Sequence, residues 1–462
     1  MIYCLGFLIS LAAGFLTVRL LTAGRLNFIL HILLALELGL GINGLVTFYT
    51  QILFNQFNRW LPIGIVILGT SVLFFNLYKE FLKNSMKLPK KNKSSSKIKQ
   101  LSSLTGWAFW ADFQFTPAQG WGLLALAILA IPLAICANYF YMGGWDAWSC
   151  WNLKAKFIFS SQENWRDVLS PNFWRSNTHY PLLWPLINVW FSDLAGNFDQ
   201  TIPMLNSITI TLLTAGILLF GLLDLTASLW ASIGAAIAVT ALPFGLILYT
   251  SQYSDALVGL FLLSAFLCLV LSEKHDIPKL KILSMVFLGL MSFTKNEGLV
   301  LAAIAAMAIF WHERNNKKQL KNLIITFLIT ALPTIIFTLF IAPKNEAFIN
   351  GLLSANKPTH WTRLAIILMY PWRVEFIASY WHGLWYLIFS GIILAGRKLW
   401  KSILGIIGLT LTLYIGIVMA NYAINTFFEI GWWLSTTLSR ILFALLPTIV
   451  LWLGLGLTLT AV

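Results

Sequence analysis

Long apolar runs, separated by short polar segments, are the feature that most constrains the fold of this 462-residue chain. Hydrophobic residues make up 58% of it and charged residues only 10%. A helix of about 20 apolar residues crosses a bilayer, and runs close to that length recur along the chain. So much apolar sequence is untypical of a soluble domain. The sequence therefore predicts an all-α polytopic membrane protein.

Thirteen membrane spans are predicted from these runs. The first run lacks a basic start and a small-residue cleavage site, so we expect a retained helix and not a signal peptide. The predicted spans are 2–22, 27–50, 60–82, 121–141, 201–223, 227–250, 255–272, 281–294, 298–312, 320–341, 378–396, 402–421 and 438–460.

A lysine-rich segment, 86–100, sets the predicted orientation. Its lysines stand among serines, which is typical of a solvated cytoplasmic loop. Counting crossings from this loop places the N-terminus outside, the C-terminus in the cytoplasm, and 142–200 and 342–377 outside. Basic residues prefer cytoplasmic loops, which explains the net charge of +14 without a nucleic-acid partner.

The predicted spans divide the chain into four parts. They are an N-terminal three-span segment (1–82), a basic cytoplasmic loop and interfacial segment (83–120), a core (121–312) that includes the outer loop 142–200, and a C-terminal transmembrane segment (313–462).

Two short stretches need their own interpretation. The basic segments 274–281 and 314–321 both belong inside, so two short helices must meet at the outer surface near Lys295. The apolar segment 181–191 contains two prolines and is too short to be a span, so we expect a re-entrant or surface helix.

The outer loop carries the first candidate site residues. Asp146 follows a span and lies among tryptophans, where partial desolvation would raise its basicity and suit it to be a general base. A helix cap or an ion pair with Lys154 or Lys156 is an equally weighted alternative. Trp145 and Trp148 could stack on a sugar ring, although ordinary interfacial aromatics are more common.

Three basic residues of the same loop could bind a phosphate. Lys154 and Lys156 could do so as point charges, or they could anchor a surface helix. His179 could donate to a phosphate or transfer a proton, whereas an isolated histidine before a proline is more often a local hydrogen-bonding residue.

The remaining candidates lie at predicted span ends. Asp255 occupies the first turn of an apolar helix, where a negative charge is favourable in itself. Lys295 and Glu297 are costly inside an apolar hairpin unless they neutralise each other or serve a function. Arg440 begins the last predicted span, where it could hold a lipid phosphate or act as a snorkelling anchor.

Other sequence features exclude some classes of protein. Walker, GxGxxG, HExxH and GxSxG motifs are missing from suitable contexts, which argues against ATPases, nucleotide-dependent dehydrogenases and common hydrolases. The four cysteines are scattered and form no CxxC pair, so neither a metal site nor a disulfide framework is expected. No cofactor is expected.

Four motifs follow one another on the predicted outer face: Asp146, His179-Tyr180-Pro181, Tyr253-Ser254-Asp255 and Thr294-Lys295-Asn296-Glu297-Gly298. Over 121–312 this pattern resembles the GT-C superfamily of membrane glycosyltransferases, particularly the dolichyl-phosphate-mannose protein mannosyltransferase and bacterial aminoarabinose transferase type. The chain departs from the family at Ala147, where a second acid is usual, and at Tyr180, which stands inside the His-Pro element. Three additional spans also precede the matching block.

The resemblance implies a transfer reaction at the outer face without a metal. The donor would be a polyprenyl-phosphate-linked sugar in the membrane, and the acceptor is unknown. Asp146 would deprotonate the acceptor hydroxyl, with Asp255 as the second catalytic residue, and the reaction would invert the anomeric carbon. Lys295, His179 or Arg440 would stabilise the departing lipid phosphate.

Two other classes of protein remain open. A secondary transporter or lipid flippase also has many helices, broken hairpins and intramembrane charges, but internal repeats and charges near mid-bilayer would be expected. In a non-catalytic assembly subunit, Asp146 and Arg440 would be dispensable. We expect a bacterial inner (plasma) membrane, because no retention signal is visible and large lumenal domains are absent.

Overall fold

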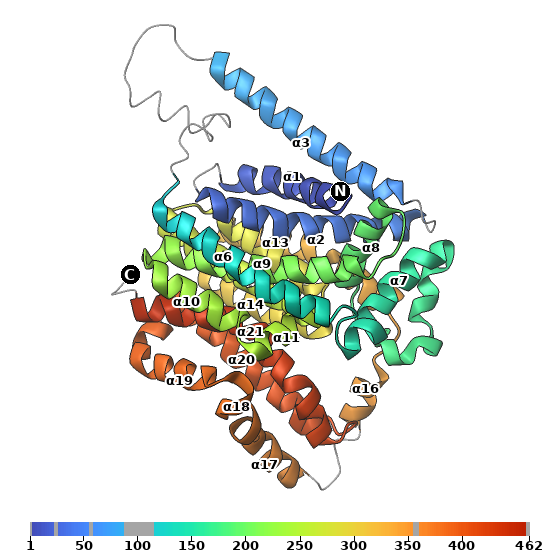
Figure 1. Ribbon diagram of the computed structural model, residues 1–462, viewed down its shortest axis with the longest axis vertical. Coiled ribbons are helices and arrows are strands. Elements are labelled where there is room, and N and C mark those ends of the chain that lie inside the picture. Colours follow the sequence, from blue (N-terminus) through green and yellow to red (C-terminus); the bar gives the residue numbers. More distant parts are fainter. Residues whose placement is uncertain (1, 23–25, 55–58, 87–114, 354–359, 459–462) are drawn as a thin grey trace.

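The computed structural model describes residues 2–22, 26–54, 59–86, 115–353 and 360–458 (Figure 1). Within these ranges the chain forms helices joined by turns and short irregular segments, and no strand occurs. The predicted all-α class is therefore confirmed. Most of the lysine-rich segment predicted as a cytoplasmic loop lies outside the described residues.

Nine helices in the described part of the chain are long and apolar enough to cross a membrane, so the protein is a multi-pass membrane protein. They are α1 (Ile2–Thr22), α2 (Phe28–Phe54), α3 (Trp60–Met86), α6 (Pro117–Tyr139), α9 (Thr201–Thr226), α12 (Ser254–His275), α15 (Lys317–Ile336), α20 (Ser402–Ile424) and α21 (Ile430–Thr458).

The remaining predicted spans form shorter or broken helices. The predicted span 227–250 is a pair, α10 (Leu229–Thr240) and α11 (Pro243–Thr250), bent by 62°. Pro243 begins α11, and a proline cannot continue the preceding hydrogen-bond ladder. The predicted count of thirteen is therefore not confirmed.

Two more predicted spans, 281–294 and 298–312, are α13 (Lys279–Ser292) and α14 (Asn296–His312). The predicted span 378–396 is divided into α18 (Ala378–Trp381) and α19 (Leu384–Ala395) around Gly383, which has a φ of 78°. That left-handed conformation suits glycine and interrupts the helix.

The two ends of the helix bundle differ (Figure 1). The end of α3, the start of α6 and the end of α21 lie at one end. At the other end lie α7 (Asn152–Ser161) and α16 (Glu346–Leu353). We call the second end the loop end, because most of the segment between α6 and α9 folds there.

The predicted re-entrant or surface helix is α8 (Leu183–Ala195). Its residues from Leu183 to Asp193 are all buried, and it packs mainly on α2 and α7. A surface location is therefore wrong, because apolar side chains surround most of this helix and leave it no polar face for water. Its 13 residues extend about 20 Å, less than a full crossing.

Helix α12 is the centre of the bundle. Its hydrophobic window is buried throughout, and it packs against α13, α21 and α9. Its first turn carries Asp255. Because α12 is packed on all sides, it fixes the position of that acid at the loop end.

Helices α1 and α2 approach each other closely through small residues. A Cβ atom added at Gly39 would lie 1.8 Å from the carbonyl oxygen of Ser10, and one added at Gly14 would lie 1.7 Å from that of Ala35. Small residues permit such close contact between membrane helices.

We predict that Gly39→Ala lowers the thermal stability of the detergent-solubilised protein, since the added methyl group must separate α1 from α2. Overpacking of this kind typically costs about 1–3 kcal/mol. Gly64→Ala in α3 is the matched control, because a Cβ there meets nothing within 4 Å. Equal melting temperatures for the two variants would contradict the close contact.

Candidate active site

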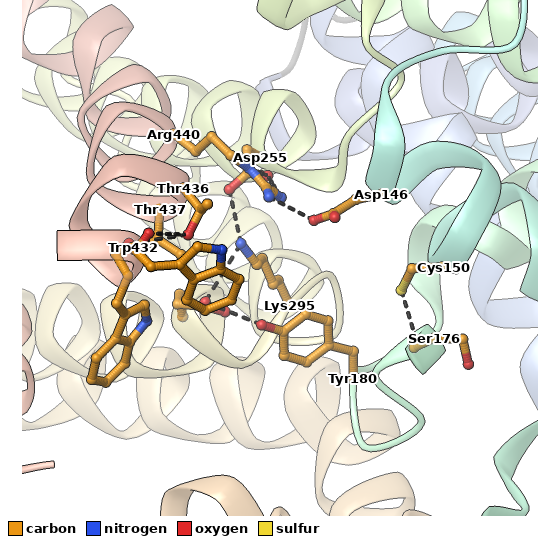
Figure 2. Close-up of polar contacts among 12 residues, drawn as sticks. Asp146, Cys150, Ser176, Tyr180, Asp255, Lys295, Trp432, Thr436, Thr437 and Arg440 are labelled. Atoms are coloured by element: carbon orange, nitrogen blue, oxygen red, sulfur yellow. Dashed lines mark hydrogen bonds and ion pairs between the residues drawn. The ribbon is translucent and has the colours of Figure 1, made fainter. Parts of the chain in front are cut away.

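Charged side chains from four distant segments meet at the loop end of the bundle (Figure 2). Asp146 precedes the short helix η1 (Ala147–Trp151), and Asp255 lies in the first turn of α12. Lys295 and Glu297 lie at the junction of α13 and α14, and Arg440 comes from α21. We call these five residues the ion cluster.

Arg440 joins the two aspartates of the ion cluster. Its Nη1 lies 2.6 Å from Asp146 Oδ2, and its Nη2 lies 2.8 Å from Asp255 Oδ2. Its Nε also donates to Asp255 Oδ2 at 3.2 Å. The flat guanidinium presents several N–H groups in fixed directions, which suits it to bridge carboxylates. The guanidinium also lies 4.4 Å from the centre of the Tyr253 ring.

Lys295 extends the ion cluster toward Glu297. Its ammonium lies 3.0 Å from Asp255 Oδ1 and 3.5 Å from Glu297 Oε1. Tyr180 donates its hydroxyl to the same Glu297 oxygen at 3.4 Å. Glu297 Oε2 has no hydrogen-bond partner within the described residues. With three carboxylates and two cations, the fully ionised cluster carries one excess negative charge.

Breaks in the helices place these side chains. Lys295 has an extended backbone, with φ −160° and ψ 156°, between the end of α13 and the start of α14. Tyr253 is likewise extended immediately before α12. Gln252 has a φ of 60°, and its side chain donates to the carbonyl of Tyr141 at 3.0 Å. These turns hold the start of α12 against the end of α6.

Helix α21 begins at Ile430, earlier than the predicted start at 438. Arg440 therefore lies inside this helix and not at its first turn. Its side chain is ion-paired to two acids, so the alternative of a snorkelling anchor is wrong.

The environment of Asp146 also differs from the sequence-based picture. Its ionic partner is Arg440, so a pair with Lys154 or Lys156 is wrong. The ring centroids of Trp145 and Trp148 lie 4.4 Å apart, and the two residues are 63% and 45% exposed. Their predicted role in stacking on a sugar remains a prediction. Asp146 itself is 24% exposed, so its side chain is accessible from the surface of the protein.

The two lysines of α7 have opposite environments. Lys154 is completely buried, and its ammonium donates to the carbonyl of Asn177 at 2.7 Å. Lys156 is exposed. Of the two, only Lys156 is open to solvent; phosphate binding by either lysine remains a prediction.

His179 lies next to Tyr180 in the segment 142–200. Its ring packs edge-to-face against the Tyr180 ring, with the ring centroids 4.8 Å apart. Burial, followed by the nearby Lys154 ammonium, lowers the pKa of His179 to about 4. His179 is therefore neutral at physiological pH and can donate one hydrogen bond or accept a proton.

Sequence reasoning left several buried polar residues outside its candidate set. Tyr180 and Tyr253 stand in the motifs but received no role. Glu375 accepts hydrogen bonds from Ser439 at 2.6 Å and from the Trp381 indole at 3.2 Å. An acid inside an apolar segment is the signal that could have identified Glu375.

A further acid, Glu37, lies inside the membrane bundle. Glu37 of α2 is 1% exposed and accepts a hydrogen bond from Ser264 of α12 at 2.5 Å. Ser264 follows Asp255 by nine residues, or about 14 Å along α12. The ionisable groups therefore do not all gather at the loop end.

A possible metal-ligand group lies at the opposite end of α12. Glu273, His312 and Glu313 offer ligand atoms within 4.8 Å of one another. However, the Lys281 ammonium lies 2.6 Å from Glu273 and 2.7 Å from Glu313. A side-chain cation thus already occupies the position between the two carboxylates.

Comparisons of the chain with protein-family models, with curated proteins and with solved structures gave no match.

We predict that Arg440→Met strongly destabilises the protein, because it leaves Asp146 without its cation and Asp255 with Lys295 alone. Breaking a buried ion pair typically costs about 3–5 kcal/mol. Thermal unfolding in detergent should show a large fall in melting temperature. The double variant Asp255→Asn/Arg440→Met should recover part of that fall. The exposed Arg373 provides the control, Arg373→Met. Stability of Arg440→Met equal to that control would contradict the proposed role of the ion cluster.

We predict a pH effect at His179. Its pKa falls from an ordinary 6.5 to about 4 in the folded protein. The neutral ring therefore contributes stability above pH 6.5, and this contribution is lost as the pH falls toward 4. Between pH 7.5 and pH 4.5 the melting temperature of wild type should fall further than that of His179→Asn. His382→Asn, at an exposed histidine, should behave like wild type. An equal fall in wild type and His179→Asn would exclude the effect.

Proposed function

We propose that this protein transfers a sugar from a polyprenyl-phosphate lipid to an acceptor at the outer face of a membrane, with inversion at the anomeric carbon. The observation that carries the proposal is the ion cluster. Four segments that are far apart in the sequence contribute to it, and all three of its acids and one of its two cations belong to the GT-C-like motifs.

In the proposed reaction Asp146 is the general base. Its Oδ2 is held by Arg440, and its side chain is partly exposed. The acceptor hydroxyl gives its proton to this carboxylate while its oxygen forms a bond to the anomeric carbon. The bond between that carbon and the phosphate oxygen breaks, and the lipid phosphate leaves with the bonding electrons.

The cations of the cluster serve the leaving group in this proposal. Arg440 and Lys295 lie together against Asp255, and both offer further donors to a phosphate. His179 can add a hydrogen bond from the outer loop. Asp255 positions the two cations, and Lys154 is left out because its ammonium is buried against Asn177.

The proposal includes an orientation. The loop end would face outward, with the N-terminus outside and the C-terminus in the cytoplasm of a bacterial inner membrane. The short helices α13 and α14 would then complete thirteen crossings together with α19 and the bent pair α10 and α11. A lipid-linked donor suits that location, because nucleotide sugars are scarce outside the cytoplasm.

A secondary transporter or lipid flippase is the second candidate. Glu37, buried in α2 and bonded to Ser264 of α12, is the observation that favours it. Ionisable groups inside a membrane bundle commonly bind transported ions or protons. The concentration of five charged groups at the loop end favours the transferase instead.

We predict that Asp146→Asn lowers sugar transfer at least a hundredfold, since the amide cannot accept the acceptor proton and general-base catalysis typically contributes about 10²–10⁴-fold. The measurement is transfer of labelled sugar from a polyprenyl-phosphate donor in proteoliposomes, with a mixed acceptor extract. The matched control is Asp167→Asn, at an exposed aspartate of the same outer loop.

The outcomes separate the candidate functions. Loss of activity in folded Asp146→Asn alone supports the transferase and its base. Equal activity in wild type and Asp146→Asn removes Asp146 as the base. If the folded wild type transfers no sugar, the transporter becomes the better explanation.

A further inference from the structure

The segment 176–184 lies at the loop end, and we call it the strap. Each of its ends is hydrogen-bonded to a different part of the protein. At its start, Cys150 donates to the carbonyl of Ser176 at 2.8 Å (Figure 2). Next to it, Lys154 donates to the carbonyl of Asn177 at 2.7 Å. Cys150 and Lys154 are four residues apart, so they lie on the same face of their helical segment. Two adjacent carbonyls are thus held by one helical face.

The far end of the strap is attached to the segments that carry the ion cluster. The backbone N–H of Leu183 donates to the carbonyl of Phe293 at 3.0 Å, just before the Lys295 turn. The Trp184 indole donates to the carbonyl of Gln252 at 3.0 Å, just before α12. The strap therefore connects the outer-loop helix with two of the segments that form the site.

Tyr180 lies in the middle of the strap and reaches the ion cluster. Its ring stacks on the Trp151 ring, with the ring centroids 5.5 Å apart and an interplanar angle of 11°. Its hydroxyl donates to Glu297. The carbonyl of Asn177 also accepts from the backbone N–H of Tyr180, at 2.9 Å. The same oxygen thus receives the Lys154 ammonium and closes the turn that presents Tyr180.

The chemistry of the two donors suits a permanent attachment. Burial raises the pKa of the Cys150 thiol to about 11, so the thiol keeps its proton and remains a donor. Burial lowers the pKa of Lys154, and its amine retains donor protons in either form. Asn177 has a φ of 50°, a left-handed conformation that asparagine tolerates but that needs support from its surroundings.

We infer that Lys154 is a positioning residue of the proposed reaction: with Cys150 it fixes the start of the strap, and through Tyr180 it sets the position of the Glu297 carboxylate in the ion cluster. This inference rests on the proposed function for its kinetic consequence, but its structural part stands on the contacts alone. It gives the buried lysine a different task from phosphate binding.

The test combines hydrogen exchange with kinetics. Lys154→Met should speed the exchange of backbone amides in 178–183, whereas Lys156→Met, at the exposed lysine two residues away, should not. In transfer assays Lys154→Met should lower kcat by up to about a hundredfold, as expected when a mutation away from the reacting atoms displaces a positioned group. Arg166→Met, at an exposed arginine of the same loop, should retain wild-type kcat.

A double-variant cycle identifies the route of the effect. If Lys154 acts through Tyr180, then Tyr180→Phe and Lys154→Met/Tyr180→Phe should have similar kcat values. Multiplied losses in the double variant would overturn the inference, and so would unchanged exchange in Lys154→Met. Cys150→Ala releases the other attachment and provides the same exchange test if Lys154→Met does not fold.

The exchange measurement also distinguishes failure of the proposed sugar transfer from failure of the positioning role of Lys154. If wild type transfers no sugar, the proposed function fails, and the exchange data alone decide whether Lys154 holds the strap. If wild type transfers sugar and Lys154→Met does so equally well, the inference fails while the proposed function stands.

Discussion

The bridge from Arg440 to Asp146 and Asp255 is the interaction on which the loop end depends. Charges are expensive near a membrane interior unless they are paired and hydrogen-bonded. Arg440 meets that requirement for two acids at once, and Lys295 does so for Asp255 on its other side. Removal of Arg440 would leave Asp146 without a cation and Asp255 with Lys295 alone. The outer loop, α12 and α21 are therefore held together electrostatically as well as by packing.

The same cluster gives the loop end its chemical character. Its two cations lie together, its partly exposed acid Asp146 lies at the edge, and Glu297 has an oxygen without a partner in the described chain. In the proposed function, the remaining donors of Arg440 and Lys295 meet the phosphate of the donor lipid. Tyr180 connects it with the buried contacts of the outer loop, so the shape of that loop and the position of Glu297 are coupled.

The sequence predicted the helical class and most span positions, because apolar length and the cost of buried charge are local properties. It predicted the gathering of Asp146, Asp255, Lys295 and Arg440 at one end by counting crossings, but it could not identify their partners. Asp146 pairs with a residue 294 positions away. The burial of Lys154 and of α8 depends on packing between distant segments, and Glu37 was missed within an otherwise apolar run.

The most direct measurement is a cryo-EM structure of the protein bound to a polyprenyl-phosphate in a lipid nanodisc. The account predicts phosphate density at the loop end within hydrogen-bonding distance of Arg440 and Lys295, with Asp146 beside it. Phosphate density at another part of the protein, or an Arg440 side chain that does not lie between Asp146 and Asp255, would contradict the account.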